Sequence, residues 1–421
     1  MPARGAAPVS AAAPHKAFPQ APRPMAPEAL LNAEERDRIR AKSAMFSPPD
    51  ATLADGRREL VGMTREQLAA EMVAIGEKPF RAKQLWHWIY HQGVTDFAAM
   101  NSIAKPLQAR LTEKFVIGRP GITTEQTSSD GTRKWLFRFR DDQQVETVYI
   151  PDDDRGALCI STQVGCTLSC TFCHTGTQKL VRNLGVAEIV GQFMAARDSY
   201  GEWPTPKGGS GDNHAGEEGR RLSNIVVMGM GEPLYNYENI AAALTIIMDH
   251  EGIALSRRRI TLSTSGVVPM MDLCGQELGV NLAVSLHATN DALRNEIVPL
   301  NRKYPIAELL AACRRYPGAS NARRITFEYV MLRGVNDSLA EAHDLVRLLA
   351  DIPAKVNLIP FNPWPGSPYK TSTPEAVRAF AEVLNEAGYS SPIRRPRGRD
   401  IQAACGQLKT ESERAARQAG R

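Results

Sequence analysis

The chain has 421 residues, of which 43% are hydrophobic and 23% charged, and its formal net charge at pH 7 is +5. No apolar run reaches the roughly 18–20 residues of a membrane span, and residues 1–30 lack the continuous apolar segment of a secretory signal. We therefore expect a cytoplasmic protein without a membrane partner. Its seven cysteines then indicate metal or redox chemistry rather than a disulfide framework.

The N-terminal third divides into three predicted parts. Residues 1–55 form an Ala- and Pro-rich leader that we expect to be mostly disordered, apart from a short charged helix at 29–42. Residues 56–118 are expected to form a helical accessory domain that binds RNA. Its aromatic side chains suit a hydrophobic core better than a platform for stacking on bases. Its helices are predicted to begin at Thr64, with Gln67 in a capping box, and to span 79–92 and 103–114.

Strand periodicity begins after residue 118. Residues 119–155 predict a β-hairpin adapter with a turn at 129–131 and its clearest strands at 135–139 and 145–150.

Six short β-branched runs alternate with amphipathic helices over residues 156–390. Such alternation predicts parallel strands joined by right-handed crossovers, and both a partial or full barrel and a doubly wound sheet fit it. A Gly-rich stretch at 201–222 is expected to be a flexible insertion. The strands are expected at 157–162, 225–230, 259–263, 281–286, 324–331 and 355–359. The helices are expected at 186–200, 237–250, 268–276, 305–316, 339–350 and 374–386.

The positive charge is concentrated in the C-terminal segment, residues 391–421. This segment carries eight basic and three acidic side chains, whereas basic and acidic side chains balance over the rest of the chain. On charge alone, the segment can be a solvated tail or a patch that binds nucleic acid or another phosphate-bearing partner.

Three cysteines, Cys166, Cys170 and Cys173, lie on one loop directly after the first strand of the β/α series. A structural zinc ion normally has four protein ligands, and His174 is poorly placed to complete a tetrahedron because it adjoins Cys173. Cys170-Thr-Phe-Cys173-His174 also matches the attachment pattern of c-type haem, which needs an export context and leaves Cys166 without a role. Three thiolates suit a [4Fe–4S] cluster with one iron left open.

The spacing Cys-x3-Cys-x2-Cys on the first β/α loop resembles the radical S-adenosylmethionine (SAM) superfamily. Further segments resemble its adenosine-methylating RNA methyltransferases: FRAKQLW from Phe80, MGMGEPL from Met228, SLHA from Ser285, PFNP from Pro360 and RGRDIQAACGQL from Arg397. The resemblance covers roughly residues 63–408. It implies an α/β fold with a partial (β/α)6 barrel, and a [4Fe–4S] cluster and SAM as cofactors.

The resemblance also implies a set of binding residues. The cluster ligands would be the three loop cysteines. The SAM contacts would follow the carboxyl ends of the strands, where parallel β/α folds bind ligands. The glycine pair in the first of them lets a ligand approach the backbone closely, although it lacks the third glycine of a dinucleotide fingerprint. The implied SAM contacts are Gly231, Glu232, Ser263, Ser285, Leu286, His287 and Asn362.

Two cysteines outside the loop would act on the RNA. In the implied mechanism Cys405 takes a methyl group from one SAM, and Cys159 resolves the later protein–RNA adduct by a transient disulfide with Cys405. Glu146 would be the proton acceptor, although a strand carboxylate is usually solvated or in a salt bridge. Cys274 and Cys313 are expected to be buried and inert.

The implied substrates are adenosine 2503 of 23S rRNA and adenosine 37 of a subset of tRNAs, both methylated at C2 with two SAM per turnover. Both targets suit enzymes that read single-stranded loops. A monomer and an electron donor such as flavodoxin are expected. Two alternatives stay open: a related enzyme that methylates C8, and an RNA-binding metal module without enzymatic activity.

Overall fold

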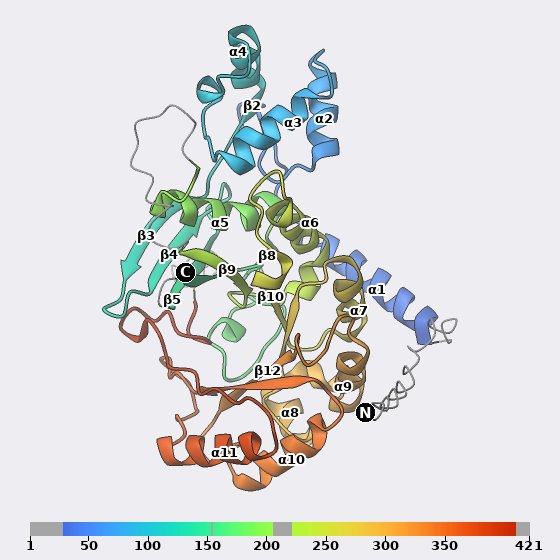
Figure 1. Ribbon diagram of the computed structural model, residues 1–421, viewed down its shortest axis with the longest axis vertical. Coiled ribbons are helices and arrows are strands. Elements are labelled where there is room, and N and C mark those ends of the chain that lie inside the picture. The colour runs from blue at the N-terminus through green and yellow to red at the C-terminus, as the bar shows by residue number, and fades with distance from the viewer. Residues whose placement is uncertain (1–27, 153–154, 205–220, 410–421) are drawn as a thin grey trace, which may run out of the picture.

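The computed structural model describes residues 28–152, 155–204 and 221–409. A nine-stranded sheet has the order β13–β12–β11–β10–β9–β6–β5–β4–β3. The six strands from β13 to β6 are parallel to one another, and β5, β4 and β3 continue the sheet in antiparallel pairs. The helical accessory domain lies at the opposite end of the molecule from α10 and α11 (Figure 1).

All six predicted β/α units are present. The parallel strands follow one another in chain order, without the reversal that marks a doubly wound sheet, so the fold is the predicted partial (β/α)6 barrel. The strands are β6 (Arg155–Cys159), β9 (Leu222–Val227), β10 (Ile260–Thr264), β11 (Asn281–Ser285), β12 (Ile325–Met331) and β13 (Ala354–Pro360). The helices are α5 (Val186–Tyr200), α6 (Tyr237–Met248), α7 (Val268–Glu277), α9 (Ile306–Arg315), α10 (Leu339–Leu349) and α11 (Pro374–Glu386). A short helix that was not predicted, α8 (Asp291–Ile297), precedes α9.

The two faces of the barrel strands differ in polarity. Side chains that face the helices, such as Leu262, Val284 and Phe327, are completely buried. The strand register places Ser285 beside Glu328 and Glu328 beside Asn357 on the opposite face, which is the barrel interior. The apolar face therefore drives packing against the helices, and the polar face is left for the site.

The predicted hairpin is present as β3 (Gly121–Thr127), β4 (Arg133–Arg138) and β5 (Gln144–Asp152). Its turn lies at the predicted position. Trp135 and Phe137 of β4 are completely buried. The hairpin therefore extends the barrel sheet beyond β6 and is built into the main core.

The accessory domain contains α2 (Arg65–Ala74), α3 (Arg81–Trp86) and α4 (Lys105–Lys114), and α3 continues into a π-helical turn at His87–His91. The predicted capping box is present. Trp86, Trp88 and Tyr90 are buried, so these aromatic side chains form a core, as predicted. A two-stranded parallel sheet, β1 (Arg58–Glu59) with β2 (Phe115–Val116), closes the domain.

Part of the N-terminal leader is ordered, contrary to the prediction of disorder as far as residue 55. Helix α1 (Glu28–Ala44) packs near α7 (Figure 1), and Ile39 is buried in the core. Arg40 donates to Glu238 at 2.6 Å, and Ser43 accepts a hydrogen bond from Asn183 at 2.9 Å. The helix adheres mainly through such polar contacts, which composition does not reveal. Residues 1–27 and 205–220, the larger parts of the predicted leader and insertion, lie outside the described residues.

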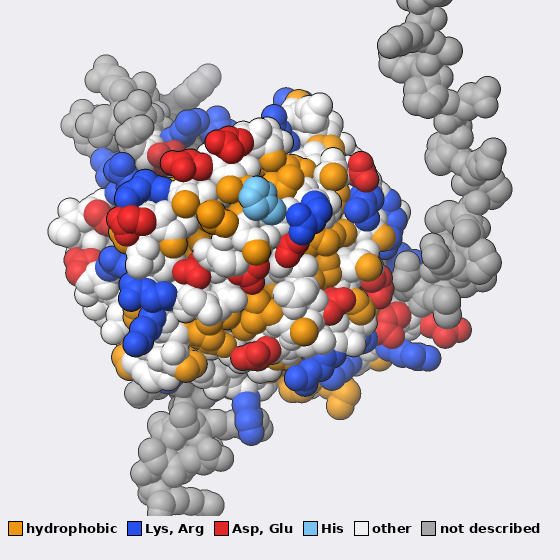
Figure 2. All heavy atoms as spheres, turned by 90° about the horizontal axis from the view of Figure 1, so that it is seen from below, with side chains coloured by type: hydrophobic (Ala, Val, Ile, Leu, Met, Phe, Trp, Pro, Cys, Tyr) orange, Lys and Arg blue, Asp and Glu red, His pale blue; other side chains and the backbone are white. Residues whose placement is uncertain are grey.

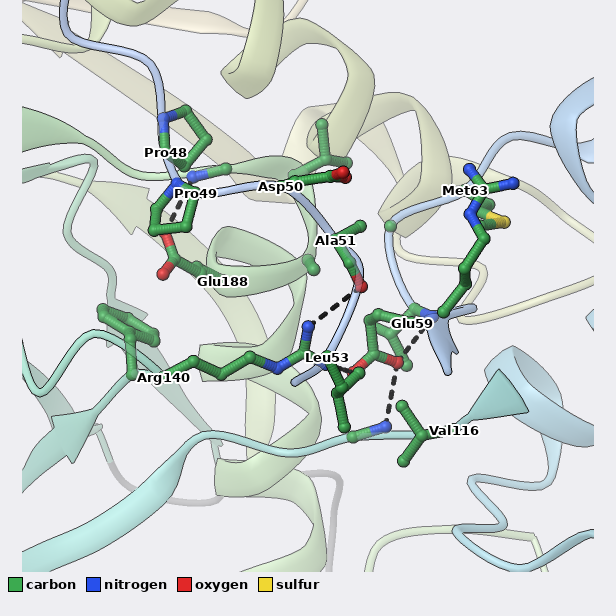
Figure 3. A pocket seen from close by; sticks show the side chains of 18 of the residues that line it. Pro48, Pro49, Asp50, Ala51, Leu53, Glu59, Met63, Val116, Arg140 and Glu188 are labelled. Atoms are coloured by element: carbon green, nitrogen blue, oxygen red, sulfur yellow. Dashed lines mark hydrogen bonds and ion pairs between the residues drawn. The ribbon is translucent and has the colours of Figure 1, made fainter. Parts of the chain in front are cut away.

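A cavity of about 580 Å³ lies between the accessory domain, the hairpin and the start of α5 (Figure 3). Its buried carboxylate, Glu59, is satisfied by Arg140 at 2.6 Å and by the backbone N–H groups of Val61 and Gly118. No cysteine lines this cavity. It is therefore separate from the predicted site.

The end of the molecule that carries α10 and α11 mixes both signs of charge, with hydrophobic side chains exposed between them (Figure 2). Among the described residues, no helix is both long enough and apolar enough to cross a bilayer.

Candidate active site

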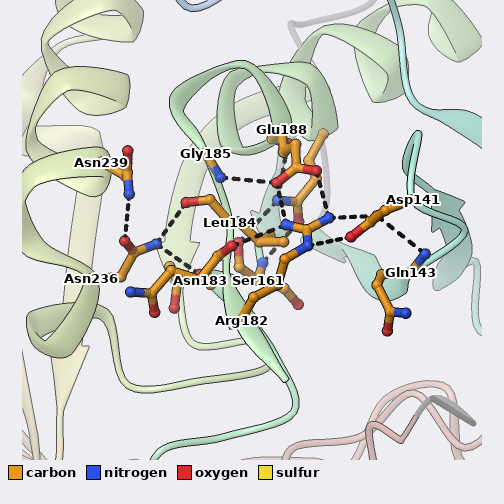
Figure 4. Close-up of polar contacts among 12 residues, drawn as sticks. Asp141, Gln143, Ser161, Arg182, Asn183, Leu184, Gly185, Glu188, Asn236 and Asn239 are labelled. Atoms are coloured by element: carbon orange, nitrogen blue, oxygen red, sulfur yellow. Dashed lines mark hydrogen bonds and ion pairs between the residues drawn. The ribbon is translucent and has the colours of Figure 1, made fainter. Parts of the chain in front are cut away.

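The three-cysteine loop is closed at its base by the pairing of β7 (Gln163–Val164) with β8 (Arg182–Asn183). Arg182 fixes this base from both sides: its guanidinium binds Asp141 of the hairpin at 2.6 and 2.8 Å and Glu188 of α5 at 2.8 Å (Figure 4). Burial lowers the pKa of Arg182, but the bonds to both carboxylates outweigh it and raise that pKa. The loop is thus held on the hairpin and on α5.

The loop cysteines Cys166, Cys170 and Cys173 are half-buried at the carboxyl end of β6. Burial raises the pKa of all three thiols, that of Cys170 to about 12, and the charges of Cys170 and Cys173 add to the effect on Cys166. Three thiols that disfavour one another's ionisation need a strong positive partner to become thiolates together.

The donor set fits an iron–sulfur cluster better than zinc. Among the described residues, no three His, Cys, Asp or Glu side chains are grouped so that they could hold a metal ion, whereas a zinc site gathers four ligands around one ion. A [4Fe–4S] cluster binds each thiolate at a different iron, so three cysteines spread along one loop suit it.

Glu232 is buried beside the cysteine loop, after β9. Its carboxylate accepts the backbone N–H groups of Leu234 at 3.1 Å and Ser265 at 2.8 Å, and burial raises its pKa to about 7. A Cβ atom on Gly231, which has a φ of +102°, would meet Gln163 at 2.6 Å. The expectation that this glycine opens space for a ligand is thus incomplete, because it also admits the neighbouring loop.

The other implied SAM residues lie at the same end of the barrel. Ser263 and Ser285 end the interior faces of β10 and β11, and Leu286 is buried directly after Ser285. His287 is buried, with Nδ1 accepting the Val330 N–H at 3.0 Å, and burial lowers its pKa to about 3, so its imidazole is neutral.

Asn362, which follows β13, has one satisfied and one unsatisfied polar atom. Its Nδ2 donates to the Cys405 carbonyl at 3.2 Å. Its Oδ1 is buried and has no hydrogen-bond partner among the described residues. A buried acceptor without a donor is costly to maintain, so this atom is available to a bound ligand.

A C-terminal strap, which we define as residues 398–409, crosses the mouth of the barrel. On the side of the cysteine loop, the His174 N–H donates to the Gly406 carbonyl at 2.8 Å and the Thr175 hydroxyl to the Leu408 carbonyl at 2.6 Å. The His174 ring stacks on Trp364 at 4.7 Å. The strap therefore lies directly on the loop.

The hairpin holds the other side of the strap. The Gly398 N–H donates to Asp130 at 3.0 Å, and the Lys409 N–H donates to Glu146 Oε2 at 2.8 Å. The other oxygen of Glu146 pairs with Lys134 at 2.8 Å. Burial raises the pKa of Glu146, and Lys134 opposes that shift. Glu146 thus tethers the strap, a structural role that the sequence interpretation did not include.

The strap brings Cys405 to Cys159. Cys159 is buried at the end of β6 and Cys405 is exposed on the strap, yet the charge of Cys405 acts on the Cys159 thiol. Burial by surrounding atoms raises the pKa of Cys405 to about 11, Glu328 adds to the shift and Arg394 opposes it. Cys274 and Cys313 are completely buried, as predicted.

Comparison with known proteins agrees with this geometry. Residues 58–117 match the model of the ribosomal RNA large subunit methyltransferase N-terminal domain, and residues 160–346 match that of the radical SAM superfamily. A protein of Gluconobacter oxydans (strain 621H) named dual-specificity RNA methyltransferase RlmN is 73% identical over 391 residues, which cover 92% of this chain and 94% of the relative. This chain belongs to the RlmN family.

Further relatives support the same assignment. The RlmN of Acidiphilium cryptum (strain JF-5) is 70% identical and covers 90% of this chain and 96% of its own length. The crystal structure of a radical SAM methyltransferase from Sphaerobacter thermophilus aligns with a TM-score of 0.76 at 44% identity, covering 84% of this chain and 99% of that one. Membership of the RlmN family confirms the predicted fold class, the enzyme class, and the [4Fe–4S] cluster and SAM as cofactors.

Sequence reasoning missed the residues that hold the site together. Arg182, Lys134 and Ser265 each bind an implied site residue or the base of its loop. Each is a single polar residue without a characteristic spacing, so only the fold reveals its partners.

Proposed function

We propose that this member of the RlmN family methylates C2 of adenosine 2503 in 23S rRNA and C2 of adenosine 37 in a subset of tRNAs. The observation that carries the proposal is the position of Cys405, on a strap across the cysteine loop and beside Cys159. A thiol there can meet a cofactor below it and an RNA base above it.

The chemistry of the target explains why a methyl carrier is needed. Adenine C2 lies between two ring nitrogens and has no lone pair, so it is a poor nucleophile for direct alkylation by SAM. When bound, the cluster and SAM supply a carbon-centred radical. Cys405 acts as the thiolate that accepts the methyl group and presents it to C2. Cys159 then attacks Cys405, which releases the methylated base and leaves a disulfide.

The assigned binding residues follow from the same geometry. Cys166, Cys170 and Cys173 hold the cluster. Glu232, a buried carboxylate, binds a cation such as the amino group of SAM. The free Oδ1 of Asn362 accepts a hydrogen bond from the same cofactor. The remaining SAM contacts are Gly231, Ser263, Ser285, Leu286 and His287.

Glu146 is proposed as the proton acceptor for the C2 hydrogen. The support is its burial near the strap and its raised pKa, which favours a base near neutral pH. Because both of its oxygens are engaged, Lys134 or Lys409 must release one of them. Glu146→Gln should still methylate Cys405 but accumulate unresolved product, and full turnover by this variant would remove Glu146 from the mechanism.

The RNA interface is proposed to include the accessory domain and four exposed arginines beside the strap, none of which forms an ion pair with another described residue. These arginines are Arg394, Arg395, Arg397 and Arg399. They flank Cys405, where phosphates of a bound loop would lie.

Neutralising three of these arginines should weaken RNA binding and flatten its salt dependence. For Arg395, Arg397 and Arg399 changed to Gln, the slope of log K against log salt should fall by about 0.9 for each lost phosphate contact. The matched control changes Arg257, Arg258 and Arg259, at the amino end of β10, to Gln. Binding measured over a salt series checks the effect, and equal slopes for both triple variants would make the strap arginines mere surface charge.

The function itself is tested with the reconstituted protein, SAM, a reductant and an rRNA fragment, incubated without oxygen. Digestion to nucleosides and mass fragmentation should show 2-methyladenosine. Modification at C8 would favour the related enzyme, and RNA binding with zinc in place of iron and sulfide would favour the metal module. We further propose that the enzyme is a cytoplasmic monomer served by a flavodoxin-like electron donor.

A further inference from the structure

Arg294, in α8, is completely buried behind the cysteine loop. Its Nε donates to the Leu286 carbonyl at 3.0 Å, and its Nη2 donates to the carbonyls of Ser265 at 2.7 Å and Ser285 at 3.0 Å. Its Nη1 donates to the side chain of Asn301 at 2.8 Å. All four acceptors are neutral, so one cation spans the ends of β10 and β11 without a carboxylate bonded to it.

A buried guanidinium of this kind is costly unless an anion lies near it. Burial lowers the pKa of Arg294 to about 10, which still leaves it protonated at neutral pH, and Cys170 is the neighbour that opposes this shift most. The nearby carboxylate of Asp291 instead accepts hydrogen bonds from Asn301 and from the Ile306 N–H. The anion that balances Arg294 is therefore at the cysteine loop.

Two contacts connect Arg294 with that loop. Ser265, whose carbonyl accepts from Arg294, hydrogen-bonds the Cys170 thiol through its side chain. The Thr171 N–H donates to the carbonyl of Ile297, in the same helix as Arg294, at 3.1 Å. The loop and α8 are thus a single hydrogen-bonded unit, with the cation at its centre.

We propose that Arg294 is a positioning residue that serves as the fixed counter-charge of the cluster held by Cys166, Cys170 and Cys173. Reduction adds one negative charge to such a cluster, so a fixed cation nearby favours the reduced form and raises the reduction potential. The same guanidinium holds the carbonyls of Ser285 and Leu286. The inference rests on the proposed function, since it needs these cysteines to bind the cluster.

The test is a redox titration of the reconstituted full-length enzyme, followed by the EPR signal of the reduced cluster. Arg294→Gln removes the charge, and its reduction equilibrium constant should fall by about tenfold, which corresponds to 59 mV for one electron. Arg294→Lys keeps the charge but cannot make all four hydrogen bonds, and its potential should stay near that of wild type. Arg315→Gln, which breaks a pair with Asp272 between α9 and α7, is the control and should change nothing.

Each outcome decides the inference. A cluster in Arg294→Gln at the wild-type potential would refute the counter-charge, as would equal shifts in the Gln and Lys variants. If Arg294→Gln loses its iron, retention by Arg294→Lys supports the charge, and loss by both assigns Arg294 a purely structural role. A wild-type protein without iron and sulfide would instead refute the proposed function.

Discussion

Cys159→Ala should stop the reaction with RNA attached covalently to the protein through Cys405. If Cys405 carries the carbon that bonds to adenine C2, release requires a second sulfur to attack Cys405 and displace the base. The structure offers one candidate for that attack, because Cys159 ends β6 directly before the cysteine loop and lies within electrostatic reach of Cys405. The variant should therefore still consume SAM, with multiple turnover lost altogether.

The controls use the other cysteines of the chain. Cys405→Ala should form no adduct, since it has no methyl carrier, whereas Cys274→Ala should resemble wild type because Cys274 is buried in α7. A denaturing gel or mass spectrum of each variant after co-expression with its RNA gives the measurement. Normal turnover by Cys159→Ala would remove its resolving role, and turnover by Cys405→Ala would overturn the carrier mechanism.

Cys170→Ala should remove the cluster and with it all methylation. Two loop thiolates cannot hold three irons, and Cys170 is also the cysteine joined to Ser265 and balanced by Arg294. Iron and sulfide content, together with the absorbance of the reconstituted protein, should fall to background while the secondary structure stays intact.

Cys313→Ala is the matched control for the cluster variant, because it removes an equally buried thiol from α9 without touching the loop. It should keep its iron. Full iron and sulfide in Cys170→Ala would contradict the ligand assignment, and loss of iron from both variants would point to general destabilisation of the fold.

Local sequence patterns predicted most of the barrel. The helices at 186–200 and 374–386 begin and end where predicted, since the apolar stripe of each amphipathic helix sets its length. The strand predicted at 225–230 begins earlier, at Leu222, and ends at Val227, because the Met-Gly-Met-Gly run turns away to pack beside Gln163. A periodicity argument cannot see such a turn, which depends on a neighbouring loop.

Long-range polar contacts were beyond prediction. Glu146 and Lys409 lie far apart in the chain, yet the strap joins them. Nothing in the composition around Arg294 distinguishes its buried guanidinium from a solvated one. In both cases the partner is chosen by the tertiary fold, whereas the loop cysteines are recognisable because all three ligands fall in one short segment.

The strap also sets an order of assembly. During synthesis the barrel, the hairpin and the cysteine loop all leave the ribosome before Cys405 does, because the strap follows every barrel strand in the chain. Until then the mouth of the barrel is uncovered, so iron and sulfide can enter from solvent. The nascent enzyme can therefore acquire its inorganic centre while it still lacks the sulfur that would be methylated, and docking of the strap is the step that makes it competent.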